Sequence, residues 1–135
     1  MHMRLTLLTL ALLHLGGCAT SAMPSCPAGM TAMKNELLYF GTDSRNGRVT
    51  SEQWMAFLEE SVTPRFPDGL SVWPASGQWR SASGAVGREE SYVLNIVHAG
   101  GPAEERAFEA IIDAYKSSFQ QEAVLRVQST VCANI

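Results

Sequence analysis

Beyond residue 34 the chain alternates between short apolar runs and apolar positions at helical spacing. Residues 36–40 are mostly apolar and aromatic, which is typical of a buried strand. A first helix is predicted to begin after Thr50, because Thr50 and Gln53 have the spacing of a capping box. Apolar residues then recur at helical intervals over residues 54–62, and a proline soon afterwards ends the helix.

The second half of the pattern predicts a hairpin, a helix and a last strand. Residues 70–80 form a strand that contains Pro74, and proline lacks the donor that an interior strand needs, so this strand belongs at a sheet edge. After a loop rich in serine and glycine, residues 91–98 return as an apolar strand. Pro102 opens a second helix, and residues 123–132 alternate as the final strand.

The order strand, helix, strand, strand, helix, strand indicates an α+β fold. The simplest arrangement is a ferredoxin-like βαββαβ sandwich, in which two helices cover one face of a four-stranded antiparallel sheet. Its usual strand order is fourth, first, third, second, so the second strand is an edge, as Pro74 requires. We therefore predict a single α+β domain over residues 32–135.

The N-terminus has the pattern of an export signal. One positive charge at Arg4 precedes an apolar run over residues 5–15, as in the n-region and h-region of a signal peptide. As a helix this run would span roughly 16 Å. The hydrocarbon core of a bilayer is about 30 Å thick, so the run is too short for a transmembrane anchor. It ends in "LGGC" at residues 15–18, which resembles the lipobox of bacterial lipoproteins.

On this interpretation residues 1–17 are a lipoprotein signal peptide, Cys18 is lipidated, and residues 18–31 are a lipidated tether. Acyl chains such as palmitate then hold the protein in the lipid bilayer, and two chains give stable attachment. No aspartate follows Cys18 to resemble an inner-membrane retention signal, so we expect the outer membrane, facing the periplasm. The alternative is an ordinary secretory signal cleaved after Ala19 or Ala22, with Cys18 discarded.

Charge argues against nucleic acid as a partner. Ten Lys and Arg stand against thirteen Asp and Glu, for a net charge of −3. Cleavage before Cys18 also removes Arg4 and leaves nine basic against thirteen acidic side chains, so the net charge becomes −4. The chain lacks the basic footprint that a polyanion demands.

The two other cysteines are placed to pair. In the predicted topology the first strand begins, and the last strand ends, at the same end of neighbouring antiparallel strands, so Cys26 and Cys132 can meet. An exported domain with two thiols favours a disulfide, and two free thiols are the alternative. With both cysteines in a bond, His98 is the one histidine left in the mature chain, so we expect no metal site and no cofactor.

The uncovered face of the sheet is the predicted binding surface. Strand parity assigns Arg126 and Gln128 to it, and His98 ends a central strand beside a glycine pair where loops often hold ligands. The expected polar and aromatic set is Tyr39, Trp79, Arg80, Asn95, His98, Arg126 and Gln128. Such a face can bind a small anion or glycan, receive a protein, or form a homodimer. The alternatives are a solvated face stiffened by cross-strand pairs and, for His98, a hydrogen-bonded packing role.

Three sequence segments of the chain resemble those of a known family. They are "LYFG" at residues 38–41, "VTPRFPDGLSVWPASGQWR" at 62–80 and "QEAVLRVQSTVC" at 121–132. Together they resemble domain of unknown function 3574, a bacterial family of short exported proteins, many with lipobox signals. The likeness runs from about residue 37 to Cys132. The resemblance implies no established activity, so it transfers no catalytic role to any residue.

Two functions from different classes follow. The first is an envelope lipoprotein, anchored through Cys18, whose domain binds an unknown protein or small-molecule ligand. The second is a small cofactor-free enzyme that uses the open sheet face, with Tyr39, His98 or Arg126 polarising a substrate. An enzyme requires a concave pocket that gathers several of these groups, whereas an interaction module needs a flatter apolar surface. The catalytic residues of the second alternative are unknown.

Overall fold

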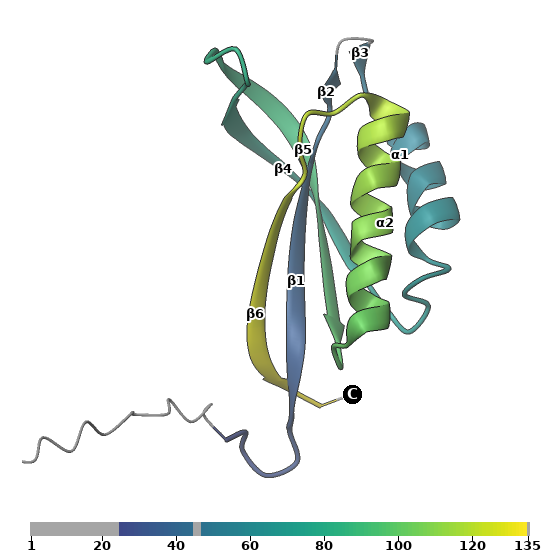
Figure 1. The fold of residues 1–135 in the computed structure, drawn as a ribbon, viewed down its shortest axis with the longest axis vertical. Coiled ribbons are helices and arrows are strands. Elements are labelled where there is room, and N and C mark those ends of the chain that lie inside the picture. The colour runs from purple at the N-terminus through teal and green to yellow at the C-terminus, as the bar shows by residue number, and fades with distance from the viewer. Residues whose placement is uncertain (1–24, 45–46, 135) are drawn as a thin grey trace, which may run out of the picture.

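The computed structural model describes residues 25–44 and 47–134 of the chain. Figure 1 shows a sheet with the helices on one of its faces. The main elements are β1 (Thr31–Gly41), α1 (Ser51–Phe57), β4 (Ser71–Arg80), β5 (Val86–His98), α2 (Pro102–Phe119) and β6 (Leu125–Ala133). The sheet has the order β4-β5-β1-β6, with every neighbouring pair antiparallel. The predicted ferredoxin-like α+β sandwich is confirmed.

Local signals in the sequence account for where the elements begin and which strand lies at the edge. Thr50 caps α1, because its hydroxyl accepts from the Gln53 backbone N–H at 3.3 Å and the Gln53 side chain accepts from the Thr50 N–H at 2.9 Å. Pro74 lies in β4, which is an edge strand as predicted. Pro102 is the first residue of α2.

Three features of the fold go beyond the predicted pattern. The helix that begins at Ser51 continues as a π-helical turn, η1 (Leu58–Val62), on the same layer. The loop after β1 contains a small hairpin of β2 (Asp43–Ser44) and β3 (Gly47–Arg48). The β4–β5 hairpin is also longer than expected, because β5 begins at Val86 rather than at residue 91.

The core lies between the helices and the face of the sheet that they cover. Phe40 at its centre packs against Trp54, Phe57 and Tyr115, with ring centroids 5.2, 5.9 and 4.7 Å away. These four rings are almost completely buried. Burial of aromatic surface on this scale is the main source of stability for a domain of this size.

The predicted disulfide is confirmed. Cys26 and Cys132 are bonded, and their Cα atoms are 5.5 Å apart. The bond lies where β1 begins and β6 ends, since Ala32 pairs with Cys132. The predicted lipidation site, Cys18, lies outside the described residues. Within the described part of the chain, no helix has the length and apolar character needed to cross a membrane.

Candidate functional site

The β4–β5 hairpin overhangs the rest of the sheet. Pairing between β1 and β5 ends at Gly41 opposite Ser91, whereas pairing between β4 and β5 continues as far as Arg80 opposite Val86. The hairpin loop returns to the body of the domain, because the backbone N–H of Ala82 donates to the Glu122 carboxylate at 3.0 Å. The part of the hairpin that extends past β1, the overhang, therefore connects the sheet to the turn that follows α2.

A cavity of about 480 Å³ lies beside this overhang. Its walls come from β1, β2, β4, β5, the turn after α2 and the start of β6. The side chains that define its chemistry are Tyr39, Asp43, Trp79, Glu89, Glu122 and Leu125. A volume of this size suits a small-molecule ligand.

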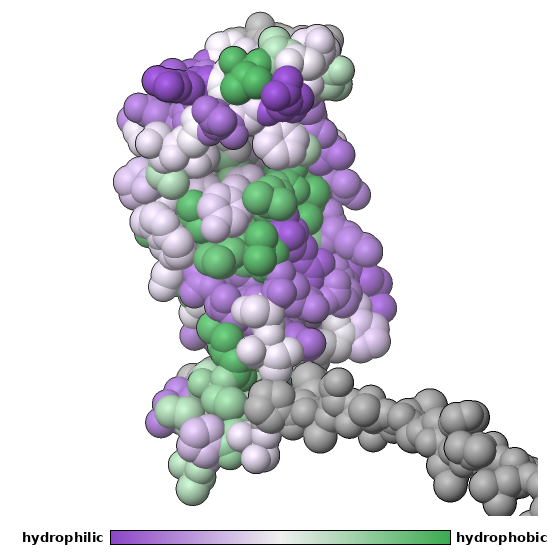
Figure 2. Space-filling view, turned by 90° about the vertical axis from the view of Figure 1, so that its left-hand side faces the viewer, coloured by the Kyte–Doolittle hydropathy of each residue, from purple (hydrophilic) through white to green (hydrophobic). Residues whose placement is uncertain are grey.

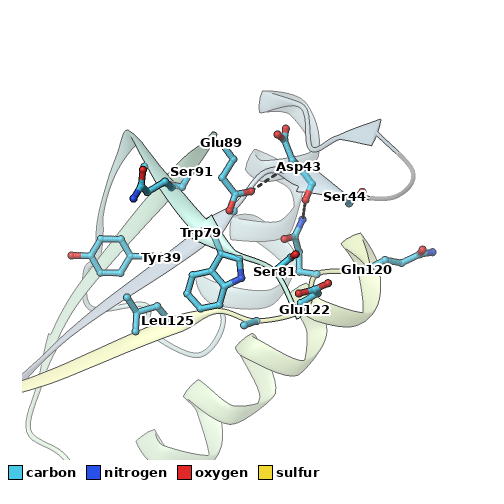
Figure 3. Close-up of a pocket in the computed structure, with 15 residues that line it drawn as sticks. Tyr39, Asp43, Ser44, Trp79, Ser81, Glu89, Ser91, Gln120, Glu122 and Leu125 are labelled. Atoms are coloured by element: carbon cyan, nitrogen blue, oxygen red, sulfur yellow. Dashed lines mark hydrogen bonds between the residues drawn. The ribbon is translucent and has the colours of Figure 1, made fainter. Parts of the chain in front are cut away.

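Trp79 and Leu125 give the cavity an apolar side. Trp79 is 46% exposed and Leu125 is 49% exposed, which is unusual for large hydrophobic residues and leaves their surfaces available for contact. Figure 3 shows the Trp79 ring facing into the cavity, with Tyr39 and Leu125 along one side of it and Glu122 on the other. Trp79, Tyr39 and Leu125 therefore form an aromatic and aliphatic wall, and Glu122 lies on the other side of the Trp79 ring.

Hydrogen bonds fix the polar walls in place. Helix α2 ends at Phe119 and is capped by Gln120, which has a left-handed φ of 53°. The chain then turns, and the Gln121 side chain donates to the Asp43 carbonyl at 3.0 Å. The Asp43 backbone N–H donates to Glu89 Oε2 at 3.3 Å. The loop after α2, strand β2 and strand β5 are thus joined around the cavity.

Gly41 makes room for the carboxylate of Glu89. A Cβ atom at Gly41 would lie 2.7 Å from Glu89 Oε2, a distance that real Cβ atoms do not show. The carbonyl of Gly41 accepts from the Tyr115 hydroxyl at 2.9 Å. Burial, with the nearby charge of Glu89, raises the pKa of Tyr115, so this phenol stays protonated as a donor.

The cavity has a negative electrostatic character. In the part of the chain that the structure describes, its lining includes the carboxylates of Asp43, Glu89 and Glu122 and no Lys, Arg or His. Asp43 forms an ion pair with Arg48 at 3.0 Å. Within the described residues, Glu89 and Glu122 have no ion-pair partner. Arg48 lines a second, more open hollow beside the cavity, together with Arg88, Glu89 and Glu90.

The structure brings only part of the predicted binding face to this site. Tyr39 and Trp79 both line the cavity. Asn95 pairs with Leu37 on the same uncovered face, but its side chain donates to Asn35 at 2.6 Å and to the Glu36 carbonyl at 3.0 Å, away from the cavity. Arg80 follows Trp79 on the opposite parity of β4, and its guanidinium donates to the Gly84 carbonyl at 3.1 Å within the hairpin loop.

The prediction that Arg126 and Gln128 lie on the open face is wrong. Arg126 is opposite Leu38, and Gln128 is opposite Glu36, so both share the face that the helices cover. The alternating pattern of the last strand predicts that its apolar residues point inward. The apolar residues Leu125 and Val127 are instead exposed on the other face.

The physical reason is a carboxylate buried in β1. Glu36 has no exposed surface, and a buried charge requires a partner of opposite charge. Arg126 provides it, with Nε 2.8 Å from Oε2 and Nη2 2.9 Å from Oε1. The same guanidinium binds Glu105 of α2 at 2.8 and 3.0 Å, and its carbon lies 4.5 Å from the centre of the Phe108 ring.

The network holds both carboxyl groups in their charged form. Burial raises the pKa of Glu36, but hydrogen bonds from Arg126 and Gln128 outweigh it and bring the net pKa below the ordinary value. The hydrogen bond from Arg126 also lowers the pKa of Glu105. Hydrogen bonds from both glutamates raise the pKa of Arg126. These residues join β1, β6 and α2 as a structural unit.

His98 also lies on the helix side of the sheet and is buried. Its Nδ1 accepts from the Gly100 backbone N–H at 3.1 Å, so the proton of the neutral ring is on Nε2, which lies 3.5 Å from Glu36 Oε1. The ring packs against Phe66 and Phe108. In the described residues, no group of three or more His, Cys, Asp or Glu side chains is placed to hold a metal ion.

These positions separate the three residues of the enzyme hypothesis. Tyr39 lies on the uncovered face, whereas His98 and Arg126 lie between the sheet and the helices. The sheet itself stands between the two groups, so they cannot contact one ligand. The sequence pattern did not identify the acidic residues of the cavity, Asp43, Glu89 and Glu122. They come together because the β4–β5 hairpin extends past β1, and the composition of the chain does not reveal that extension.

Residues 34–135 match the model of the family described as "Protein of unknown function (DUF3574)". The chain belongs to this family. No curated protein matches the chain. The predicted membership in the DUF3574 family is confirmed, and its description assigns no activity.

Solved structures share the fold of this DUF3574 domain. One is a phage SAM lyase in complex with S-methyl-5'-thioadenosine, with a TM-score of 0.60 and 12% identity over 85% of this chain and 97% of that chain. Another is CutA from Synechococcus elongatus complexed with a Bis-Tris molecule, with a TM-score of 0.51 and 14% identity over 78% of this chain and 88% of that chain. At these identities the likeness shows the fold alone.

The rest of the uncovered face carries an apolar patch. Figure 2 shows hydrophobic side chains gathered at the centre of this face, with hydrophilic side chains above and below them. Trp73, Leu125 and Val127 of this DUF3574 domain are between 42% and 49% exposed. Exposed apolar area of this kind is typical of interaction surfaces. The homodimer expected through this face stays a prediction.

Proposed function

We propose that the chain is a lipid-anchored protein of the bacterial envelope whose domain binds a small molecule in the cavity beside the β4–β5 hairpin. The observation that carries this proposal is the cavity itself, of about 480 Å³, with Trp79 and Leu125 half exposed in its wall. Large apolar side chains held in a concave site with a few fixed polar groups are typical of ligand pockets.

The anchor rests on the sequence and on the redox state of the cysteines. The lipobox-like "LGGC" ends at Cys18, behind an apolar run of signal-peptide length. The Cys26–Cys132 disulfide suits a compartment outside the cytoplasm. Ala19, in place of an aspartate, supports the outer membrane with the domain in the periplasm.

An anchor at Cys18 would also orient the domain. Cys26 is the eighth residue after Cys18, so this part of the chain spans at most about 29 Å. The disulfide end of the domain would therefore stay near the membrane. Tyr39 lies seven residues beyond Ala32 in β1, which is roughly 24 Å along the strand. The cavity would then lie at the end of the domain that is distant from the anchor.

The solved structures of similar fold support a small-molecule site in a limited way. The phage SAM lyase holds S-methyl-5'-thioadenosine, and the cyanobacterial CutA holds a Bis-Tris molecule. They support only the idea that this fold accommodates small ligands, because function depends on the site and not on the fold.

Native mass spectrometry of the full-length protein, purified from its own envelope in a non-ionic detergent, tests this proposal. We expect an acylated N-terminal cysteine and a co-purified small molecule that the Trp79→Ala variant loses. Trp73→Ala is the matched control, since Trp73 is 42% exposed on the same face but does not line the cavity. An unacylated N-terminus would overturn the anchor, and equal occupancy in both variants or no occupancy at all would overturn the site.

A further inference from the structure

We infer that the cavity beside the β4–β5 hairpin selects a small organic cation, such as a primary or quaternary ammonium compound with an apolar portion. This inference rests on the proposed ligand-binding function of the cavity and assigns the chemical class of its ligand. Three features of the site carry it, namely its charge, its aromatic wall and the free oxygens of its carboxylates.

The first feature is the sign of the charge. Among the described residues, the lining contains the carboxylates of Asp43, Glu89 and Glu122 and no basic side chain. Arg48 neutralises Asp43 from outside the lining, at 3.0 Å, and also contacts Glu90 at 3.1 Å. Two carboxylates of the lining are left without a cation in the described part of the chain. An anionic ligand would meet like charge on several sides of the cavity.

The second feature is the aromatic wall. Trp79 and Tyr39 both line the cavity, and Figure 3 shows the ring of Trp79 between the acidic groups and Leu125. The face of an indole ring is negatively polarised and attracts ammonium groups, for which tryptophan is the best aromatic partner. Leu125 supplies an apolar surface for the uncharged part of such a ligand.

The third feature is that two carboxylates of the lining are each held by one backbone hydrogen bond and keep a free acceptor oxygen. Glu89 accepts from the Asp43 N–H through Oε2, and Glu122 accepts from the Ala82 N–H through Oε2. Within the described residues, Oε1 of each carboxylate has no donor. A primary ammonium group would supply that donor through charge-assisted hydrogen bonds, which are stronger than neutral ones. A quaternary ammonium group has no N–H and would be attracted by the charge of the carboxylates alone.

The walls are pre-organised for this role. Gly41 admits the Glu89 carboxylate, and the loop after α2 is tied to β2 through Gln121. Because these groups are held before a ligand arrives, little ordering is required on binding. A metal ion is a poorer candidate, since no group of three potential ligands is assembled among the described residues.

The charge dependence is tested with a pair of probes of equal shape. Choline and its uncharged isostere 3,3-dimethylbutan-1-ol are titrated into the full-length protein in a non-ionic detergent at low salt, by calorimetry. We expect choline to bind at least about tenfold more tightly, the scale of one cation–π contact. Equal binding of the two probes, or tighter binding of the alcohol, would overturn the inference.

Variants assign the effect to the cavity. Glu89→Gln and Glu122→Gln keep the acceptor for their backbone donors and remove the charge, so each is expected to weaken choline binding by about three- to tenfold through lost charge–charge attraction. Glu60→Gln is the matched control, because Glu60 is an exposed residue of η1 on the helix layer. Unfolding in urea verifies that each variant is folded. Equal effects of Glu60→Gln and Glu89→Gln would place the charge dependence outside the cavity and overturn the inference.

The design separates this inference from the proposed function. If neither probe binds while a co-purified molecule is still lost in Trp79→Ala, the cavity binds a ligand of another class and only the cation inference fails. If no co-purified molecule is found and neither probe binds, both fail. A co-purified ligand that carries a positive charge would support both.

Discussion

Arg126 holds the buried carboxylate of Glu36 through two parallel hydrogen bonds, 2.8 Å from Nε to Oε2 and 2.9 Å from Nη2 to Oε1. Its other edge binds Glu105 of α2. One guanidinium therefore joins β6 to the central strand β1 and to a helix. The polar side of β6 faces inward for this reason.

Loss of this guanidinium should be strongly destabilising. Arg126→Met leaves Glu36 buried without a cation, and breaking a buried pair in this way lowers the free energy of unfolding by about 3–5 kcal/mol. Arg48→Met is the control, because Arg48 forms its ion pairs at the surface, where a pair contributes about 0–1 kcal/mol. Urea unfolding with the disulfide intact measures both. Similar values for the two variants would show that the network does not stabilise the fold.

The same network predicts how stability depends on pH. The pKa of Glu36 in the folded protein lies below its ordinary value of 4.5, since hydrogen bonds from Arg126 and Gln128 outweigh the effect of burial. The unfolded chain therefore binds this proton more readily. The stabilisation is complete above pH 4.5 and is lost as the pH falls through the lower folded-state value.

Chemical unfolding at a series of pH values below 6 tests this dependence. Glu36→Gln should have a flatter profile than the wild type in the acid range, because the titrating group is gone. Glu105→Gln should flatten it less, since the Glu105 side chain is 46% exposed. Parallel profiles for the wild type and Glu36→Gln would contradict the assignment.

The disulfide should contribute to stability through the length of the loop it closes. Cys26 and Cys132 are 106 residues apart in the sequence. On the chain-entropy model, Cys26→Ser with Cys132→Ser lowers the free energy of unfolding by roughly 4–5 kcal/mol. Urea unfolding of the double variant, beside the oxidised wild type, measures the difference. A change below about 1 kcal/mol would show that the bond closes a loop already ordered in the unfolded chain.

Gly41 and Gly87 offer a matched pair of substitutions, because Gly41 lines the cavity and Gly87 does not. A Cβ at Gly41 meets the Glu89 carboxylate at 2.7 Å, whereas a Cβ at Gly87 meets nothing within 4 Å. Glu89 is the flexible partner, so Gly41→Ala should displace it with a small loss of stability and a clear loss of choline affinity. Gly87→Ala should leave affinity unchanged. Calorimetry and urea unfolding of both variants measure this, and equal affinities would contradict the role of Glu89.

Much of the fold could be predicted because local chemistry and the global topology agree. The capping box at Thr50, the proline that confines β4 to an edge and the order of the elements all indicate one sandwich. That sandwich brings the ends of β1 and β6 together, so the pairing of Cys26 with Cys132 followed from it.

The orientation of the last strand could not be predicted from alternation alone. Leu125 and Val127 alternate with Arg126 and Gln128, and the hydrophobic pattern places the first pair inward. The buried carboxylate of Glu36 reverses this, because desolvating it without a cation costs more than leaving two aliphatic side chains exposed. A glutamate inside a buried strand was the signal that could have decided the parity.

The cavity was beyond prediction for a different reason. It depends on how far β4 and β5 extend past β1, which is a matter of register and not of composition. Tyr39 and Trp79 were identified as members of a binding face from their residue type. Their acidic partners come from β2, from β5 and from the turn after α2, which are distant in the sequence.

The most direct test of the ligand site is the indole N–H signal of Trp79 in the NMR spectrum of the full-length protein. The chain has three tryptophans, and single Trp→Phe variants assign their signals. On titration with choline, and then with a small-molecule extract of the envelope, we predict a saturable shift of the Trp79 signal while those of Trp54 and Trp73 stay in place. A Trp79 signal that neither addition moves would contradict the site.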